Sequence, residues 1–422
     1  MVRPRLARLL RTSLILLAVA AAGGFLFAWS GLYNVAASRK HFAVTTELLD
    51  FVLRNSIETW STGIETPPLD DPALAERGAG HFAGFCAPCH GAPGQPANVV
   101  VRQMLPAPPA YDEAVRPWKN SELFRVVKHG LKYTGMPAWP AQARDDEVWA
   151  MVAFLRGLPD MTAAQYRVAT DAAAAETAAE TAADAPEQPG AATPPRAAQA
   201  IAASGLTSTS PVACARCHGP NGEGSPAGGV PRIAGQRPAY LLATLRDYAL
   251  GVRPSGIMQP VAALLSDEQL RSLADYYAGL PGTAPTAETR GPERIAATAI
   301  TSGAVLGSAA STGDDLPRSR LLQKGAALAA TGDPSAAIPA CDSCHGEDGR
   351  GEGKLPRYPA LAGQHRAYLE QQLALWRTGV RGGSASRIMQ AAARNLSDAQ
   401  IRAVALHYAT RGNARVPPAV RP

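Results

Sequence analysis

Three copies of one short motif dominate the sequence, and together they contain all six of its cysteines. Each copy has the spacing C-x-x-C-H, which is typical of covalent haem c attachment. Two thiols on one turn of helix can bond to the two vinyl groups of a porphyrin, and the adjacent imidazole then lies beneath the iron. We therefore expect three covalently attached haem c groups. The predicted attachment sites are Cys86 and Cys89, Cys214 and Cys217, and Cys341 and Cys344, and the predicted proximal iron ligands are His90, His218 and His345.

A redox-active dithiol and a structural zinc site are two other uses of paired cysteines, and both fit less well. A thioredoxin-like pair needs no histidine after its second cysteine and rarely occurs three times in one chain. A structural zinc site usually combines two pairs about 15–20 residues apart. Here the pairs begin at Cys86, Cys214 and Cys341, which are 128 and 127 residues apart. Haem is therefore the interpretation that we favour.

The nearly equal spacing of the motifs predicts three homologous domains. The stretch Ala234-Gly235-Gln236 after the second motif recurs as Ala362-Gly363-Gln364 after the third, with an offset of 128 residues. Two intervening segments lack the apolar periodicity that a core needs, so we expect linkers there. The predicted division is a cytoplasmic tip and membrane anchor at 1–34, a periplasmic helical stalk at 35–71, domain 1 at 72–160, a linker at 161–199, domain 2 at 200–281, a linker at 282–317 and domain 3 at 318–412.

Composition and periodicity both favour helices. Aromatic residues make up only 6% of the chain, while 39 glycines and 36 prolines suit short helices joined by irregular loops. Ser266 with Gln269, and Ser397 with Gln400, predict capping boxes that begin two terminal helices. We predict an all-α fold, in which an N-terminal transmembrane helix precedes three haem domains joined by Ala/Pro/Gly-rich linkers. Each domain ends in an apolar helical stripe: Val148/Met151/Val152/Leu155, Leu270/Leu273/Ala274/Tyr277 and Ile401/Val404/Ala405/Tyr408.

A haem iron with one histidine ligand keeps a second axial position, and we expect methionine there. Domain 2 contains only Met258 and domain 3 only Met389, which follow their proximal histidines by 40 and 44 residues. Domain 1 has several methionines, of which Met136 stands out in Thr-Gly-Met-Pro-Ala-Trp, 46 residues after His90. A thioether on a loop braced by proline and glycine can be held against the iron, and Met/His ligation raises the reduction potential. Met136, Met258 and Met389 are therefore the predicted axial ligands.

Other methionines and histidines suit this role less well. Met151 lies on an apolar stripe and is expected to pack in a core, whereas Met104 is expected in a loop. His129 could compete with Met136 as a ligand. With six ligands on each iron no site stays open for a substrate, which argues against peroxidase or oxygen chemistry. The remaining histidines are expected to be surface or hydrogen-bonded polar residues: His41, His81, His365 and His407.

The three domains resemble class I cytochrome c. Gly78 and Phe82 precede Cys86 by eight and four residues, as in the N-terminal helix of that family. Domains 2 and 3, with their Ala-Gly-Gln and Ile-Met-Gln stretches, resemble the di-haem cytochrome c-four family, whereas domain 1 is similar to a different branch. The overall plan is similar to cytochrome c subunits of periplasmic alcohol and gluconate dehydrogenases, in which the hydrophobic segment is usually C-terminal. The resemblance implies three cytochrome c-like domains exported to the periplasm.

The N-terminal segment is suited to a membrane. Residues 12–38 carry no charge and follow four arginines. About 20 apolar residues suffice to cross a bilayer, and Trp29 and Tyr33 suit the far interface. A cleaved signal is the alternative, with cleavage near Ala20-Ala21-Ala22, but the apolar run continues past that point. We expect a single-pass anchor in the bacterial inner membrane, with the haem domains in the periplasm and a further helix over 41–59.

Three haems with two axial ligands each are suited to one-electron transfer. We expect a respiratory-chain carrier that takes electrons from a dehydrogenase or quinol-oxidising complex and passes them to a soluble cytochrome or terminal oxidase. One alternative is the cytochrome c subunit of a membrane-bound periplasmic dehydrogenase complex that reduces quinone, and another is a haem peroxidase. A carrier or electron-transfer subunit is favoured over a stand-alone enzyme. The formal charge of +6 lies largely in the four N-terminal arginines, so nucleic acid is not an expected partner.

Overall fold

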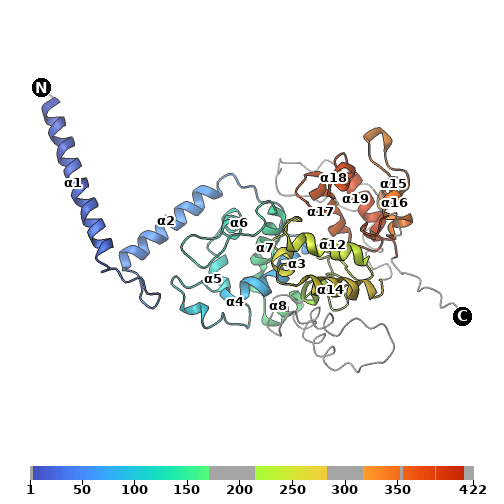
Figure 1. Cartoon of the computed structure of the whole chain (residues 1–422), viewed down its shortest axis with the longest axis horizontal. Coiled ribbons are helices and arrows are strands. Elements are labelled where there is room, and N and C mark those ends of the chain that lie inside the picture. Colours follow the sequence, from blue (N-terminus) through green and yellow to red (C-terminus); the bar gives the residue numbers. More distant parts are fainter. Residues whose placement is uncertain (1–2, 171–213, 283–316, 352–354, 385, 413–422) are drawn as a thin grey trace.

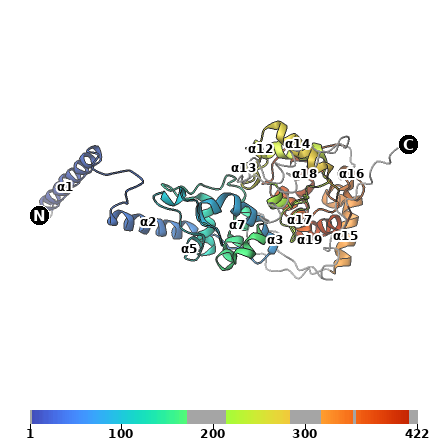
Figure 2. The same ribbon diagram turned by 90° about the horizontal axis from the view of Figure 1, so that it is seen from below.

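The computed structural model describes residues 3–170, 214–282, 317–351, 355–384 and 386–412. Within these ranges the chain is helical, and β-type pairing is limited to two isolated bridges, Ala92 with Gln95 and Asp333 with Ile338. Figures 1 and 2 show one long helix that extends away from a body of shorter helices. The prediction of an all-α fold is confirmed.

Helix α1, Arg3–Trp29, stands apart from the body, and helix α2, Ala43–Ser61, connects it to domain 1 (Figure 1). The stretch from Leu6 to Trp29 is long and apolar enough to cross a membrane, and no part of it is buried inside the protein. Helix α2 lies where the sequence predicts a helix. It buries Ile57 near its end, while Trp60 stays exposed.

Domain 1 is built around two helices that cross closely. Helix α3, Pro72–His81, continues into a π-helical turn at Phe82–Cys86 and crosses α7, Asp145–Gly157. At the crossing, a Cβ atom on Gly78 would lie 2.5 Å from Ala150 O, so a side chain there would push the helices apart. The other elements are α4 (Ala87–His90), η2 (Val101–Gln103), α5 (Tyr111–Val115), α6 (Asn120–His129), η3 (Leu158–Asp160) and α8 (Ala163–Ala169).

The core of domain 1 includes one residue from the segment that the sequence assigns to a linker. Met151 is buried there, which confirms its predicted packing role. The sequence analysis places 161–199 in a linker, whereas Tyr166 of α8 is buried in this core. Composition averaged over the segment hides the single aromatic side chain that anchors its start. Residues 171–213 lie outside the described residues.

Domains 2 and 3, which we keep as a proposed division, place their helices in the same order. After the motif helix come a long helix, a short helix that carries the predicted ligand methionine, and a terminal helix. The predicted capping boxes are confirmed, since the Ser266 and Ser397 hydroxyls each accept a hydrogen bond of 3.2 Å, from Gln269 N and Gln400 N.

The helices of domain 2 are α11 (Ala215–His218), α12 (Pro238–Ala249), α13 (Met258–Ala262) and α14 (Asp267–Gly279). Those of domain 3 are α15 (Arg318–Thr331), η5 (Pro334–Ala336), α16 (Asp342–His345), η6 (Glu347–Gly349), α17 (Arg366–Arg377), α18 (Ser386–Ala393) and α19 (Asp398–Ala409).

Candidate haem sites

Each cysteine–histidine motif forms one helical turn, in α4, α11 and α16. His218 N donates to Cys214 O (2.9 Å) and His345 N donates to Cys341 O (3.0 Å). Residues at positions i, i+3 and i+4 share a helix face, so the two thiols and the imidazole of each motif lie on one side. The six thiols are half-buried and form no disulfide. The three motifs fit covalently bound haem c.

A proline carbonyl orients the histidine of every motif. The Nδ1 atoms of His90, His218 and His345 lie 2.8, 2.9 and 2.9 Å from the carbonyl oxygens of Pro109, Pro231 and Pro359. A carbonyl oxygen only accepts hydrogen bonds, so Nδ1 carries the hydrogen and Nε2 is left to bind a metal. The sequence analysis missed these prolines. Their spacing from the histidine differs between domain 1 and the other two, and a carbonyl gives no residue-type signal.

Burial sets the protonation of the motif side chains. It raises the pKa of the Cys86 thiol to about 12, and those of Cys214 and Cys341 to about 11. Thiols held neutral in this way differ from the low-pKa cysteines of thiol–disulfide enzymes. Burial lowers the pKa of His218 and His345, which favours the neutral imidazole that binds iron. Among the described residues, no three His, Cys, Asp or Glu side chains are grouped as a metal ion would need.

Two cavities bring the predicted haem residues of domains 2 and 3 together. The cavity beside α16 has a volume of about 670 Å³, within the range of cofactor sites. The cavity beside α11 is narrower, at about 220 Å³. The first is lined by Cys341, Cys344, His345 and Met389, and the second by Cys214, Cys217, His218 and Met258, among others. The ligand roles of these residues stay predictions.

In domain 1, Met136 lies half-buried in a tight turn after α6. Its backbone nitrogen donates to Thr134 Oγ1 (3.1 Å). A Cβ atom on Gly130 would lie 2.5 Å from Met136 O, and Gly130 has a φ of +61°, so the turn requires glycine at this position.

The other candidates in domain 1 differ in position. Met104 lies closer to Met136 than its place in the sequence suggests, because a Cβ atom on Gly135 would be 2.3 Å from Met104 Cε. The structure thus places a second thioether beside the Met136 turn. His129, the alternative ligand, is exposed at the end of α6.

Two buried arginines line both cavities. Arg253 and Arg381 are 4% and 6% exposed, and the ion pairs of the described residues include neither of them. Arg253 donates to the Tyr368 hydroxyl (3.2 Å), both donate to Gln372 Oε1, and Arg381 Nε has no partner in the described part of the chain. Burial, followed by repulsion from Arg253, lowers the pKa of Arg381. A buried cation is costly unless an anion accompanies it. Haem propionates are carboxylates, so the two arginines fit that group.

A symmetric pair of glutamines joins domains 2 and 3. Gln236 Nε2 donates to Ala360 O (3.0 Å), and Ala360 N donates back to Gln236 Oε1 (2.8 Å). Gln364 makes the same exchange with Arg232, at 2.9 Å in both directions. The Ala-Gly-Gln repeat is therefore a contact between the two domains, which the sequence identifies as a repeat but not as an interface.

Domain 1 also contacts the second motif directly. A Cβ atom on Gly80 would lie 2.2 Å from Cys217 Sγ. Glu76 of the same helix accepts a hydrogen bond from Ala227 N (2.8 Å). His81 follows Gly80 and lines the domain 2 cavity.

The histidines outside the motifs depart in part from expectation. His41 is hydrogen-bonded to Tyr33 (2.5 Å), and His365 Nε2 bonds to Glu223 O (3.0 Å), as expected of polar partners. His81 is only 7% exposed, and its Nδ1 has no partner among the described residues, so the expectation of a surface or satisfied side chain is wrong there. His407 is buried rather than at the surface.

Comparison with known proteins identifies relatives of all three domains. Residues 73–155 and 190–276 match the family described as Cytochrome C oxidase, cbb3-type, subunit III. Residues 322–408 match the Cytochrome c family. Each matched stretch contains one of the three motifs.

Individual relatives are di-haem cytochromes or partners of a dehydrogenase. The chain is 36% identical to the thiosulfate dehydrogenase electron acceptor of Thiomonas intermedia, over 46% of this chain and 76% of that protein. It is 33% identical to cytochrome c4 of Thiocapsa roseopersicina, over 45% of this chain and 83% of that protein. A solved structure of cytochrome c4 from Acidithiobacillus ferrooxidans matches at 30% identity and a TM-score of 0.35, over 47% of this chain and 98% of that chain. The sequence matches confirm the predicted resemblance to the cytochrome c-four family.

Proposed function

This chain belongs to the c-type cytochromes and is a multihaem electron-transfer protein, and on that premise we propose that it is a membrane-anchored relay in the bacterial periplasm. It takes single electrons from a periplasmic dehydrogenase or a quinol-oxidising complex. It passes them to a soluble cytochrome or a terminal oxidase. Haem c supplies the one-electron chemistry, since its iron alternates between the ferrous and ferric states.

The observation that carries this proposal is the direct contact between neighbouring haem sites. Gly80, six residues before Cys86, packs against the Cys217 sulfur of the next motif. The cavities of domains 2 and 3 share lining residues, including Tyr240 and Arg381. Three sites connected in this way support electron transfer through the chain without a diffusing carrier.

The residues of each site have proposed roles. The cysteine pairs attach the group, and His90, His218 and His345 bind iron with an orientation set by their proline carbonyls. Met136, Met258 and Met389 are the proposed second axial ligands. Arg253 and Arg381 hold the propionates of domains 2 and 3 and stabilise their negative charge.

The proposed anchor is helix α1. Its apolar stretch Leu6–Trp29 is of sufficient length to span a bilayer and is not covered by the rest of the protein. A signal sequence passes the same test. Mass spectrometry of the mature N-terminus distinguishes the two, because an anchor retains Leu6–Trp29 and a cleaved signal loses most of it.

A thiosulfate dehydrogenase is the donor that the relatives favour, since one relative accepts electrons from such an enzyme. A second candidate function is a permanent subunit of a membrane-bound dehydrogenase that reduces quinone. The exposed apolar residues Phe51 and Trp60 of α2 favour this alternative, because a subunit interface would cover them.

The test uses the full haem-loaded chain in detergent. We expect a thiosulfate dehydrogenase with thiosulfate to reduce all three haems, and a soluble cytochrome c to reoxidise them. A stable, monodisperse monomer would count against the permanent-subunit alternative. Reduction by neither a dehydrogenase nor a quinol-oxidising complex, or irons that bind cyanide and carbon monoxide readily, would contradict the relay.

A further inference from the structure

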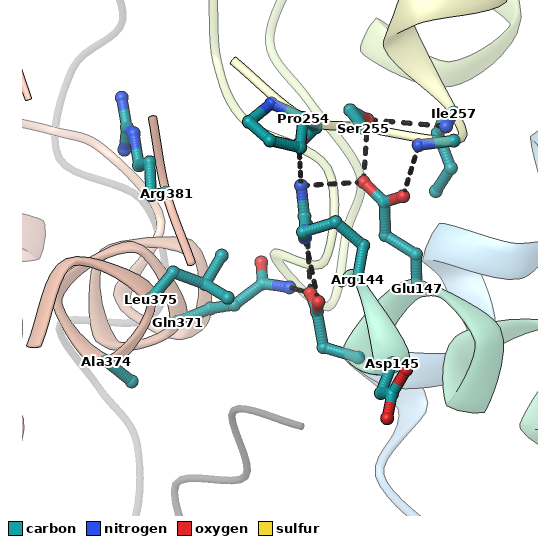
Figure 3. A network of polar contacts seen from close by, with 12 residues as sticks. Arg144, Asp145, Glu147, Pro254, Ser255, Ile257, Gln371, Ala374, Leu375 and Arg381 are labelled. Atoms are coloured by element: carbon teal, nitrogen blue, oxygen red, sulfur yellow. Dashed lines mark hydrogen bonds and ion pairs between the residues drawn. The ribbon is translucent and has the colours of Figure 1, made fainter. Parts of the chain in front are cut away.

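A cluster of charged side chains is buried where domain 1 meets the other two domains (Figure 3). Arg144, Asp146 and Glu147 lie at the start of α7, and Glu147 is only 3% exposed. Charges in the first turn of a helix are ordinarily solvated and interact with the helix dipole. These three instead face loops of domains 2 and 3.

Glu147 holds the loop that leads to Met258. Its Oε1 accepts a hydrogen bond from the Ser255 hydroxyl (2.6 Å), and its Oε2 accepts one from Gly256 N (2.6 Å). The Ser255 oxygen in turn accepts hydrogen bonds from Met258 N (3.0 Å) and Ile257 N (3.3 Å). A hydroxyl has one hydrogen and two lone pairs, so all of its bonding capacity is used. The Glu147 carboxylate is thus two hydrogen bonds away from the backbone of Met258.

Arg144 and Asp146 fix this carboxylate in place. Arg144 forms a two-point ion pair with Asp146 (2.8 and 2.9 Å), contacts Glu147 at 2.9 Å and donates to Pro254 O (2.7 Å). Gln371 of domain 3 donates to Asp146 (2.5 Å). Figure 3 shows Arg144 between the Pro254 loop and the end of Gln371. Buried polar networks of this kind are rigid when every member is paired.

Apolar contacts connect the same loop to the Met136 loop of domain 1. A Cβ atom on Gly256 would lie 2.0 Å from Trp139 Nε1, so the indole rests on the backbone of the domain 2 loop. Trp139 also donates to Glu147 Oε2 (3.2 Å), and Ile257 packs against the core of domain 1. The two loops that carry predicted ligand methionines therefore meet at Glu147.

We propose that Glu147 of domain 1 is a positioning residue for the haem of domain 2. By holding Ser255 and Gly256, it fixes the start of α13 and with it the side chain of Met258. Docking of domain 1 thereby completes the haem site of domain 2 and sets the strength of its methionine ligation. This inference rests on the proposed function's assignment of Met258 as an axial ligand.

The experiment compares variants of the full haem-loaded chain by two readouts. One is the charge-transfer absorbance of ferric haem with a methionine ligand, and the other is a potentiometric titration of the three haems. Glu147→Ala is expected to remove up to about one third of that absorbance and to lower the potential of one haem, because Met/His ligation raises it. Glu147→Gln, which keeps an acceptor oxygen, is expected to restore part of both signals.

Glu122→Ala is the matched control. Glu122 is another buried carboxylate of domain 1, and it accepts its hydrogen bond from Lys119 N within that domain. Its loss should leave the absorbance and all three potentials unchanged. If Glu147→Ala loses haem, Ser255→Ala gives the same test by removing a single hydroxyl.

Two results would overturn the inference. Unchanged absorbance and potentials in Glu147→Ala or Ser255→Ala refute it, and so do equal shifts in all three haems, which indicate general loosening. Met258→Ala separates this failure from failure of the ligand assignment. If Met258→Ala loses about one third of the absorbance while Glu147→Ala loses none, only the positioning role is refuted. If Met258→Ala loses none, the ligand assignment and the inference both fall.

Discussion

Replacing Gln236 by alanine is expected to weaken the contact between domains 2 and 3 at one defined amide. Gln236 exchanges two hydrogen bonds with the backbone of Ala360, and both residues are buried. The variant leaves Ala360 N and O without these partners. Gln364 makes the equivalent exchange with Arg232 and is untouched by the substitution.

The size of the effect follows from the two hydrogen bonds. A neutral hydrogen bond contributes about 1 kcal/mol net, and a buried group left unpaired costs about 1–3 kcal/mol. We take about 2 kcal/mol for the free energy of local opening at Ala360. At 1.4 kcal/mol per factor of ten, this corresponds to about 30-fold faster hydrogen exchange of the Ala360 amide.

Hydrogen exchange of the haem-loaded chain measures this directly. In Gln236→Ala the Ala360 amide should exchange faster while the Arg232 amide keeps its rate, and Gln364→Ala should give the reverse. An increase below about threefold at Ala360 would show that the glutamine does not protect it. Equal increases at both amides would show that the two exchanges open as one unit, which contradicts the assumption of independent contacts.

Three further predictions concern pH, packing and charge. Burial lowers the pKa of His81 to about 4, so the unfolded chain takes up a proton near pH 6.5 before the folded one does, and domain 1 should lose about 3 kcal/mol of stability as the pH falls from about 6.5 to about 4. Thermal unfolding of His81→Leu should show most of this pH dependence removed, and an unchanged pH dependence would contradict the assignment. Gly78→Ala should destabilise domain 1 by about 1–3 kcal/mol through contact with Ala150 O, whereas Gly279→Ala, which has open space, should change thermal unfolding little. Arg381→Met should lower the potential of a haem in domain 2 or 3, since a buried cation favours the ferrous state, and potentiometry that finds all three potentials unchanged would argue against a propionate partner.

The parts of this protein that sequence analysis predicts are those with local signals. The C-x-x-C-H spacing indicates haem because the chemistry requires three side chains on one helical turn. The Ser266 and Ser397 capping boxes are predicted for the same reason, since cap and partner are three residues apart. The π-helical turn at Phe82–Cys86 has no such signal, and it was not predicted.

Contacts between domains are what the sequence does not show. Asp146 and Glu147 look like ordinary acidic residues at the start of a helix, and only the fold reveals that Pro254 and Ser255 lie opposite them. His81 looks like a polar residue at a helix end, but it is buried because domain 2 covers it. In each case the partner is more than a hundred residues away, beyond the reach of any periodicity.

The two domain contacts differ in kind, and the difference has a consequence for the haems. Domains 2 and 3 meet through equivalent residues, Gln236 with Gln364 and Arg253 with Arg381, each pair 128 residues apart. Such a self-complementary contact alone would give both haem sites the same surroundings. Domain 1 breaks this equality, because Glu147 lines the cavity of domain 2, while the described residues around the domain 3 cavity all come from domains 2 and 3. Two copies with the same predicted ligands therefore hold their haems in unequal environments, and a chain of unequal sites is what directional electron transfer requires.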